Sequence, residues 1–164
     1  MANVMYCVNG HFVGIVNPIR RARSRGEINA FMAQQAPAKG LPAFCTRCGA
    51  SNVAACQHCE TRIEVDYPGS TPGYCGGCGK PFPWTDTALS SAKEYTDELD
   101  QLSQEEKTAL KGTFDDLTSD TAKTPLAASR FKRIMSKVGP GAEGVFKKFL
   151  ETVATEAAKK MMGL

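Results

Sequence analysis

Residues 45–78 read CTRCGASNVAACQHCETRIEVDYPGSTPGYCGGC and contain three Cys-x-x-Cys pairs. A fourth pair, Cys7 and His11 in CVNGH, precedes them with three residues between its members. The four pairs use every cysteine of the chain and supply eight side chains of the kind that binds zinc. These are Cys7, His11, Cys45, Cys48, Cys56, Cys59, Cys75 and Cys78. Eight ligands divide into two tetrahedral sites, so we expect two Zn2+ ions per chain.

The number of ligands also bears on function. Zinc bound by four protein ligands has no open position for water or a substrate, so such a site stabilises a fold and performs no chemistry. No nucleophile–base pair and no phosphate-binding loop is visible in the rest of the sequence. We therefore expect a protein that is not an enzyme and has no small-molecule substrate.

The Cys-x-x-Cys pairs share the local pattern of zinc knuckles. Gly49 and Gly79 each follow a second cysteine and supply the positive φ that turns backbone N–H groups toward the thiolates. Residues 61–67 alternate polar and apolar side chains, with Ile63, Val65 and Tyr67 on the apolar side, which is the period of a half-buried strand. The expected fold is a small zinc-stabilised β-rich module, either a double zinc ribbon or cross-braced knuckles. Its expected strands are 4–6, 12–16, 52–54, 61–66 and 81–83.

The spacing leaves open which pairs share a zinc ion. A site made of the second and third pairs has only residues 49–55 between them, which is tight for the hairpin of a ribbon. A cross-braced arrangement avoids this constraint, and we favour it. One ion would then be bound by Cys7, His11, Cys56 and Cys59, and the other by Cys45, Cys48, Cys75 and Cys78.

Cys7 and His11 also have a second interpretation, as a buried free cysteine beside a surface histidine. Ligation is favoured because six ligands alone would leave one site incomplete, and because Gly10 loosens the turn between the two residues. His58 lies between two ligands in CQHC and is expected to point into solvent.

Length and composition fit one or two small globular domains. The chain has 164 residues, of which 42% are hydrophobic and 23% charged, close to the average of soluble proteins. No apolar run approaches the ~18 residues that span a bilayer, and the N-terminus lacks the basic and apolar segments of a signal peptide. We expect a cytoplasmic protein with no membrane span, in which dense cysteine pairs bind metal and do not form disulfides.

The composition changes near Trp84, after which there is no cysteine. We therefore place a domain boundary there, with a two-zinc module at residues 1–84 and a helical region at residues 85–164. Charge is segregated in the second part, because residues 86–121 carry three basic and ten acidic side chains and residues 122–164 carry nine basic and three acidic ones. The acidic block is expected to be a solvated face.

Four amphipathic helices are expected in the second part. Helical periodicity begins at Thr85, a suitable N-cap, and a second helix begins after Ser103, which forms a capping box with Glu106. A third helix begins after Thr124, with Pro125 at its first position. The apolar positions of these helices are Leu89, Ala92, Tyr95, Leu99 and Leu102; Ala109, Leu110, Phe114 and Leu117; and Ala127, Phe131, Ile134 and Val138.

The fourth expected helix has the widest apolar stripe of the chain. Core packing in a small bundle is one interpretation of the stripe. Self-association or binding of a protein partner is another, because a small bundle buries little apolar surface. An interfacial membrane helix is a third, which the nearby lysines favour and the glutamates oppose. The stripe consists of Val145, Phe146, Phe149, Leu150, Val153, Ala157 and Met161.

Residues 20–25, RRARSR, are the most basic segment. One interpretation is a patch that binds the phosphates of nucleic acid or another polyanion. The other, which we favour, is a solvated loop or arginines that contact the acidic helices, because no aromatic residue interleaves with them. A short helix is expected after Ser24, which forms a capping box with Glu27. The four arginines are Arg20, Arg21, Arg23 and Arg25.

These motifs resemble those of an uncharacterised bacterial family, a domain-of-unknown-function family with a zinc-ribbon N-terminus. The resemblance rests on CVNGH, FCTRCGA, CQHC and YCGGCGKPFPWT, followed by ALSSAKEYTDEL. It extends over residues 4–102, and more loosely over the helical tail. The resemblance implies two zinc-binding clusters joined to an α-helical region, and it implies no established activity.

The favoured function is a non-catalytic zinc-binding adaptor that binds a protein partner and self-associates through its C-terminal helices. The alternative is a nucleic-acid-binding zinc-ribbon protein that uses residues 20–25 and a basic segment of the third helix. The isoelectric point near 8.5 is modest for that role, and the acidic block opposes it. The basic residues of the third helix are Arg130, Lys132, Arg133 and Lys137.

Overall fold

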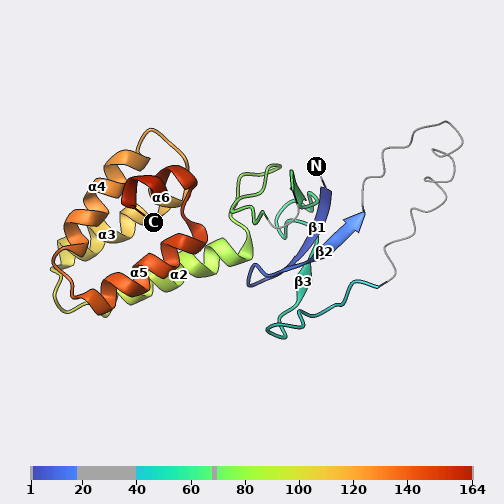
Figure 1. Ribbon diagram of the computed structural model, residues 1–164, viewed down its shortest axis with the longest axis horizontal. Helices are drawn as coiled ribbons and strands as arrows, with labels where there is room; N and C mark the ends of the chain where they lie inside the picture. The colour runs from blue at the N-terminus through green and yellow to red at the C-terminus, as the bar shows by residue number, and fades with distance from the viewer. Residues whose placement is uncertain (1, 18–39, 68–69, 164) are drawn as a thin grey trace, which may run out of the picture. The chain divides into compact units, whose positions relative to one another are not determined.

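A computed structural model of the protein describes residues 2–17, 40–67 and 70–163 (Figure 1). The chain divides into an N-terminal unit, Met1–Trp84, and a helical unit, Thr85–Leu164. The division falls where the cysteines end. The basic segment at 20–25 and the short helix expected after it lie outside the described residues.

Strand β1 (Ala2–Cys7) is the centre of a small antiparallel sheet with the order β2-β1-β3. One edge of β1 pairs with β2 (Phe12–Asn17), to which a tight turn connects it. The other edge pairs with two very short strands, β3 (Asn52–Val53) near the end of β1 and β4 (Glu64–Val65) near its start. The first strand therefore brings together segments that lie far apart in the sequence.

The N-terminal unit has a small core on one side of this sheet. Val4 and Tyr6 of β1 are fully buried, and Ile63 and Val65 are nearly so. The alternation predicted at residues 61–67 is thus confirmed for Ile63 and Val65. It is wrong for Tyr67, which is 66% exposed, because β4 ends at Val65 and the chain leaves the sheet there.

The strand expected at residues 81–83 is reduced to one bridge, between Tyr74 and Pro81. Helix α2 begins directly afterwards, at Pro83. Proline suits the first turn of a helix, because its missing N–H would have no partner there. The cap position is therefore Phe82, and the cap expected at Thr85 is three residues too late.

The helical unit contains five helices among the described residues, where the sequence predicted four. Figure 1 shows them packed against one another, with α5 alongside α2. Their bounds are α2 (Pro83–Asp97), α3 (Gln104–Thr118), α4 (Thr124–Met135), α5 (Pro140–Val153) and α6 (Glu156–Met162).

The helix starts follow the predicted capping in one case and not in another. The capping box at α3 is confirmed, since the Ser103 hydroxyl accepts from the N–H of Glu106 and the Glu106 carboxylate accepts from the N–H of Ser103. Thr124 is the first residue of α4 and not its cap. Its buried hydroxyl instead donates to the carbonyl of Ser119 at 2.9 Å. This hydrogen bond stabilises the connection between α3 and α4.

The fourth expected helix is broken into α5 and α6. Ala154 has an extended backbone, and Thr155 caps α6 by accepting the N–H of Ala158. The N–H of Thr155 donates to the carbonyl of Leu117 in α3 at 3.1 Å. A hydrogen bond to another helix thus stabilises the break, and helical periodicity carries no sign of such a contact.

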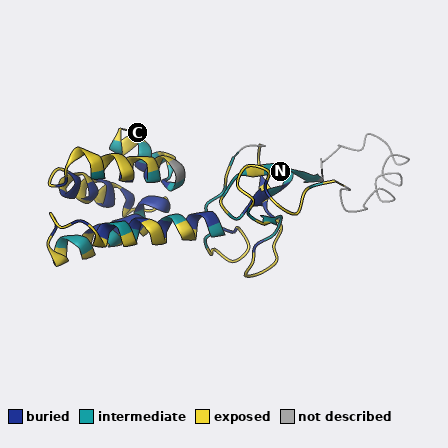
Figure 2. Ribbon diagram, turned by 90° about the horizontal axis from the view of Figure 1, so that it is seen from below, coloured by how far each residue is buried: buried dark blue, intermediate teal, exposed yellow. Residues whose placement is uncertain are grey.

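One apolar core fills the helical unit, and Figure 2 shows the buried positions on the facing sides of its helices. Phe146 and Leu150 of the wide stripe lie in this core, at 1% and 0% exposure. Leu99 and Leu102 are also buried, although α2 ends before them. Among the described residues, no helix is both long and apolar enough to cross a membrane. The core consists of Leu89, Ala92, Leu99, Leu102, Leu110, Phe114, Leu117, Ala127, Ala128, Phe131, Ile134, Met135, Val138, Phe146, Leu150, Ala154 and Ala158.

Candidate metal centres

Each Cys-x-x-Cys pair lies at the tip of its own short hairpin, and the three hairpins have the same structure. In the first, the N–H of Cys45 donates to the carbonyl of Ala50, and the N–H of Gly49 donates to the carbonyl of Cys45, both at 2.8 Å. A third bond, of 3.0 Å, closes the base of the hairpin. The hairpins around Cys56 and Cys75 repeat all three bonds at equivalent positions, between 2.8 and 3.0 Å. The sequence spacing therefore produces one local structure three times.

The residue after each pair has a positive φ. Gly49 and Gly79 have φ values of 72° and 71°, which confirms the prediction made for these glycines. Glu60 occupies the same position in the second hairpin, with a φ of 58°. A residue with a Cβ is strained in this left-handed region, so the conformation of the second hairpin costs more backbone energy than that of the other two.

Cys7 and His11 form a tighter turn, which joins β1 to β2. The N–H of Cys7 donates to the carbonyl of His11 at 2.9 Å, and the N–H of Gly10 donates to the carbonyl of Cys7 at 2.8 Å. Gly10 has a φ of 82°, which agrees with its predicted role in the turn. The turn brings the Cys7 sulfur and the His11 ring to the same end of the hairpin.

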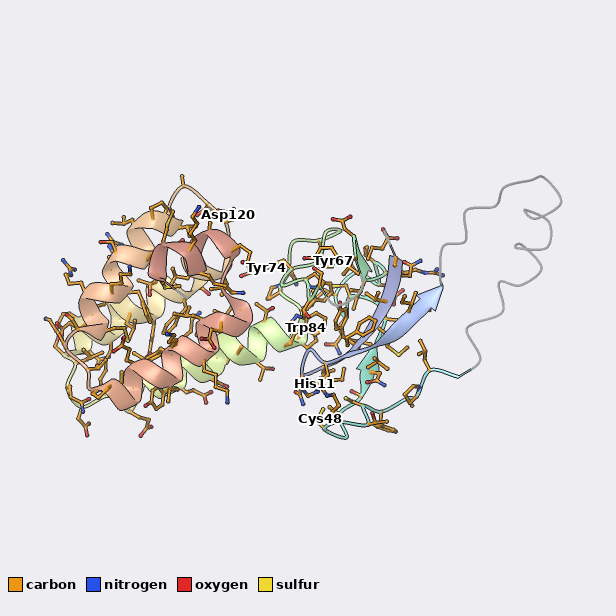
Figure 3. All side chains as sticks on the ribbon, in the orientation of Figure 1. His11, Cys48, Tyr67, Tyr74, Trp84 and Asp120 are labelled. Carbon is orange, nitrogen blue, oxygen red and sulfur yellow. The ribbon has the colours of Figure 1, made fainter. Side chains whose placement is uncertain are left out.

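The eight predicted ligands come together in two groups of four. We name Cys7, His11, Cys45 and Cys48 the first cluster, and Cys56, Cys59, Cys75 and Cys78 the second cluster. In each cluster the ligand atoms all lie within 4.8 Å of one another, so that each could hold one metal ion. Figure 3 shows His11 and Cys48 of the first cluster close together. None of the seven cysteines forms a disulfide.

The cross-braced grouping predicted from the sequence is wrong, and so is a site made of the second and third pairs. The extended segment between those two pairs advances about 3.3 Å per residue, which carries them to opposite ends of β1. Asn52, in the Cys45 hairpin, pairs with Cys7. Ile63, in the Cys56 hairpin, accepts a hydrogen bond from Val4 at 3.0 Å. Sheet register therefore groups the first pair with the second and the third with the fourth.

Distances inside the clusters are similar. In the first cluster the sulfurs of Cys7 and Cys48 are 3.8 Å apart, and Cys45 Sγ lies 3.7 Å from His11 Nδ1. In the second cluster the Cys56 sulfur lies 3.7 Å from that of Cys78, and the Cys59 sulfur lies 3.6 Å from that of Cys75. Both clusters thus have the spacing of atoms that share a bound ion.

The two cysteines of each pair differ in burial. The first cysteine is buried against the core, at 5% exposure for Cys45, 2% for Cys56 and 3% for Cys75, and the second is exposed. The backbone N–H of His58 points at Cys56 Sγ, at 3.4 Å. The exposed His58 side chain belongs to neither cluster, as the sequence suggested.

Hydrogen bonds lower the pKa of two exposed thiols. The backbone N–H of Ala50, and after it the Asn9 side chain, lower the pKa of Cys48 to about 6. The hydroxyl and then the backbone N–H of Thr61 lower the pKa of Cys59 to about 6. Asn9 Nδ2 lies 3.5 Å from the Cys48 sulfur, and Thr61 Oγ1 lies 3.2 Å from that of Cys59. The ligand spacing did not identify these two supporting residues, although each lies within two positions of a ligand.

The thiol of Cys78 behaves in the opposite way. The backbone N–H of Lys80 lowers its pKa, but the Cys59 thiol, the loss of hydration and the Cys56 thiol together outweigh that effect and raise the pKa to about 12. Thiolates at such short distances repel one another, so they ionise together only beside a cation. The second cluster is therefore suited to bind a positive ion.

Residues 24–162 match the model of a family described as "Uncharacterized protein conserved in bacteria (DUF2321)". The chain belongs to this family. No curated protein matches the chain, and no solved structure does. The match confirms the family resemblance drawn from the motifs, and it differs in extent, since it begins later and reaches almost to the C-terminus. All three Cys-x-x-Cys pairs lie inside the matched DUF2321 region, whereas Cys7 and His11 precede it.

Proposed function

We propose that the protein is a non-catalytic adaptor whose N-terminal unit binds two zinc ions and whose surfaces bind a protein partner, including a second copy of the chain. The observation that carries the proposal is the assembly of eight ligands into two clusters of four. Each cluster supplies a complete tetrahedral ligand set, so a bound ion would stabilise the fold and would not act on a substrate.

Zinc fits these clusters in geometry and in chemistry. A tetrahedral ion with Zn–S bonds of about 2.3 Å has ligand atoms about 3.8 Å apart, and two pairs of ligand atoms in each cluster lie 3.6–3.8 Å apart. Thiolates and imidazole are soft ligands that suit zinc and not magnesium or calcium. The first cluster would bind zinc through three thiolates and one imidazole, and the second through four thiolates.

The absence of catalysis is a testable part of the proposal. Cobalt can replace zinc in such sites, and its absorption bands report the number and type of its ligands. We expect tetrahedral, thiolate-rich spectra that do not change when azide or cyanide is added, because no ligand position is open. A spectrum that shifts with either anion would reveal an open position and would support a catalytic metal.

Charge favours a protein partner over nucleic acid. The chain has a formal net charge of +3 with its cysteines protonated. Two zinc ions would add four positive charges, and the seven thiolates that bind them would add seven negative ones. The zinc-bound protein is then close to neutral, whereas proteins that bind nucleic acid usually carry a clear positive excess.

The basic residues of α4 and of the turn that follows it are partly used inside the helical unit. Lys132 Nζ donates to the carbonyl of Met161 at 2.7 Å, and Lys137 forms an ion pair with Glu106 of α3. Arg130 and Arg133 are exposed and remain candidates for contact with phosphates. If nucleic acid is the partner, its affinity will fall steeply as the salt concentration rises, and Arg130→Ala will reduce the slope of that fall. An affinity that does not depend on salt would reject this alternative.

Self-association through the C-terminal helices is the most specific part of the proposal. Phe146 and Leu150 are buried inside the helical unit and are not available to a partner. Leu126, Val145 and Met161 remain, with exposed fractions of 52%, 48% and 43%. These three apolar side chains support an interface on α4, α5 and α6.

Native mass spectrometry of protein purified without chelator tests zinc binding and self-association together. We expect two zinc ions per chain and a dimer that Val145→Lys converts to monomer. Ser129→Lys is the matched control, because it places the same charge at an exposed polar position of α4. A zinc-loaded wild-type monomer would reject self-association and keep the metal sites, whereas a chain without zinc would reject the sites themselves.

A further inference from the structure

Three aromatic side chains contact segments that carry the two clusters. The rings of Phe82 and Trp84 are stacked, with centroids 4.8 Å apart and an interplanar angle of 20°. The Tyr6 ring packs on the same indole, with its centroid at 5.2 Å. All three side chains are buried, at 0% exposure for Tyr6, 4% for Phe82 and 8% for Trp84. We name Tyr6, Phe82 and Trp84 the aromatic stack.

The aromatic stack touches the turn that carries half of the first cluster. Tyr6 immediately precedes Cys7, which is itself fully buried. A Cβ added to Gly10, between Cys7 and His11, would lie 3.1 Å from the Cβ and Cγ atoms of Trp84. The turn therefore rests directly on the indole, and the position of the indole determines where the Cys7 and His11 ligand atoms can lie.

The same stack is part of the second cluster's support. Phe82 closes the base of the hairpin that carries Cys75 and Cys78, because its N–H donates to the carbonyl of Gly73 at 2.9 Å. Cys56 and Cys75 share one buried apolar cluster with all three aromatic residues. The indole N–H of Trp84 also donates to the carbonyl of Pro72 at 2.8 Å, in the segment that leads into this hairpin.

We propose that the aromatic stack couples the two metal sites, so that zinc bound at either cluster raises the affinity of the other. The inference rests on the proposed zinc binding. A metal ion at the second cluster orders the Cys75 hairpin, and with it Phe82 and Trp84. The ordered indole then holds the turn of the first cluster in its binding conformation. An ion that binds at the first cluster therefore loses less entropy in ordering that turn.

Native mass spectrometry measures this coupling in the full chain. Metal-free protein receives one equivalent of Zn2+, and the populations with zero, one and two ions are recorded. For independent sites, the product of the zero- and two-ion populations cannot exceed about one quarter of the squared one-ion population, whatever the two affinities are. Coupling of about tenfold raises the ratio of that product to the squared one-ion population about tenfold, and a ratio above one quarter can arise only from coupling.

Phe82→Leu tests the aromatic stack itself. It keeps an apolar side chain and removes the stacked ring, so we expect the population ratio to fall about tenfold. Phe114→Leu is the matched control, the same change at a fully buried phenylalanine of the helical unit, and it should leave the ratio unchanged. If Phe82→Leu has the same population ratio as the wild-type protein, the proposal is overturned.

A second measurement keeps the proposal testable if Phe82→Leu does not fold. Linkage requires equal coupling in both directions. Cys48→Ser should lower the zinc affinity of the second cluster, and Cys78→Ser that of the first, by the same factor of about ten relative to the loaded wild type. Unchanged affinity in either variant would overturn the coupling and leave the sites intact. Failure of wild-type protein to bind zinc at all would instead reject the proposed function.

Discussion

The two units of this chain are stabilised in different ways. The N-terminal unit has strands of two to six residues and a small buried cluster, in which two of the members are cysteines. The helical unit has helices of up to 15 residues around a larger core of aliphatic and aromatic side chains. The comparison indicates that the second unit depends on apolar burial, whereas the first would depend on metal ions bound by its two clusters.

The difference follows from size and element length. Strands of two residues contribute few ladder hydrogen bonds, and sheets this small are marginally stable in water by themselves. Metal ions bound at the two clusters would supply the missing free energy, because the knuckles cannot form a defined site in an unfolded chain. In the helical unit each helix buries an apolar face against several others, so no ion is needed. Removing one contribution should therefore affect one unit and spare the other.

The largest expected effect comes from Cys45→Ser, which removes a buried ligand of the first cluster. A structural zinc site is worth on the order of 10 kcal/mol, so we expect the N-terminal unit to keep at most the ion of the second cluster and to lose most of its stability, while the helices persist. Trp84, the sole tryptophan, reports on the first unit by fluorescence, and far-UV circular dichroism reports on the helices. His58→Ala is the control and should keep both ions. A Cys45→Ser chain that retains two ions would show that the ligand assignment is wrong.

Phe146→Ala is the corresponding test of the helical unit. The Phe146 ring is 1% exposed and packs against Tyr95, Phe114 and Phe131 at centroid distances of 5.3–6.1 Å. We expect a loss of about 3–5 kcal/mol in the free energy of unfolding of the helices, measured by denaturation under circular dichroism. Lys147→Ala, at the exposed residue on the other side of Phe146, should cost less than about 0.5 kcal/mol. Loss of zinc in the Phe146→Ala chain would contradict the independence of the two units.

Ser103→Ala should produce a smaller loss in the same unit. The change removes the hydroxyl of the capping box and leaves the N–H of Glu106 without its partner at the start of α3. We expect a loss of about 1 kcal/mol in unfolding free energy. Ser129→Ala, on the exposed side of α4, is the control. Equal behaviour of the two variants would mean that the capping box contributes nothing to stability.

Glu60→Gly sharpens the comparison in the opposite direction, because it should stabilise the N-terminal unit. Glu60 has a φ of 58° at a position where the other hairpins have glycine. Release of this strain, less the extra freedom of glycine in the unfolded chain, predicts a gain of about 0.5–1 kcal/mol. Denaturation of zinc-loaded protein, followed by Trp84 fluorescence, measures the gain. Gly79→Ala should destabilise by a similar amount, and a stable Gly79→Ala chain would remove the argument from strain.

Much of the local structure could be predicted because it depends on neighbours in sequence. The positive φ at Gly49 and Gly79 and the capping box of Ser103 with Glu106 arise from residues within a few positions of one another. The errors occurred where a distant segment intervened. Helical periodicity continues through Thr155, but the hydrogen bond from its N–H to Leu117 favours a break there.

The apolar stripe of the last expected helix shows a related limit. Its spacing predicted that one face would be apolar, and it could not tell which neighbour would cover that face. The structure places Phe146 and Leu150 in the core of the unit and leaves Val145 and Met161 exposed. Core packing is therefore the main role of the stripe, and any interface must use the residues that remain.

The nature of the eight candidate ligands, the knuckle turn and the change from cysteine-rich to helical sequence all follow from the sequence alone, because each depends on residue type and short spacing. The grouping of the ligands was decided by the tertiary structure. The pairing of β1 with β3 places Cys7 beside Asn52, and its pairing with β4 places Val4 beside Ile63, so the register of one strand determines which cysteines can share an ion. Spacing fixes how each hairpin turns, whereas pairing between distant strands fixes which hairpins meet.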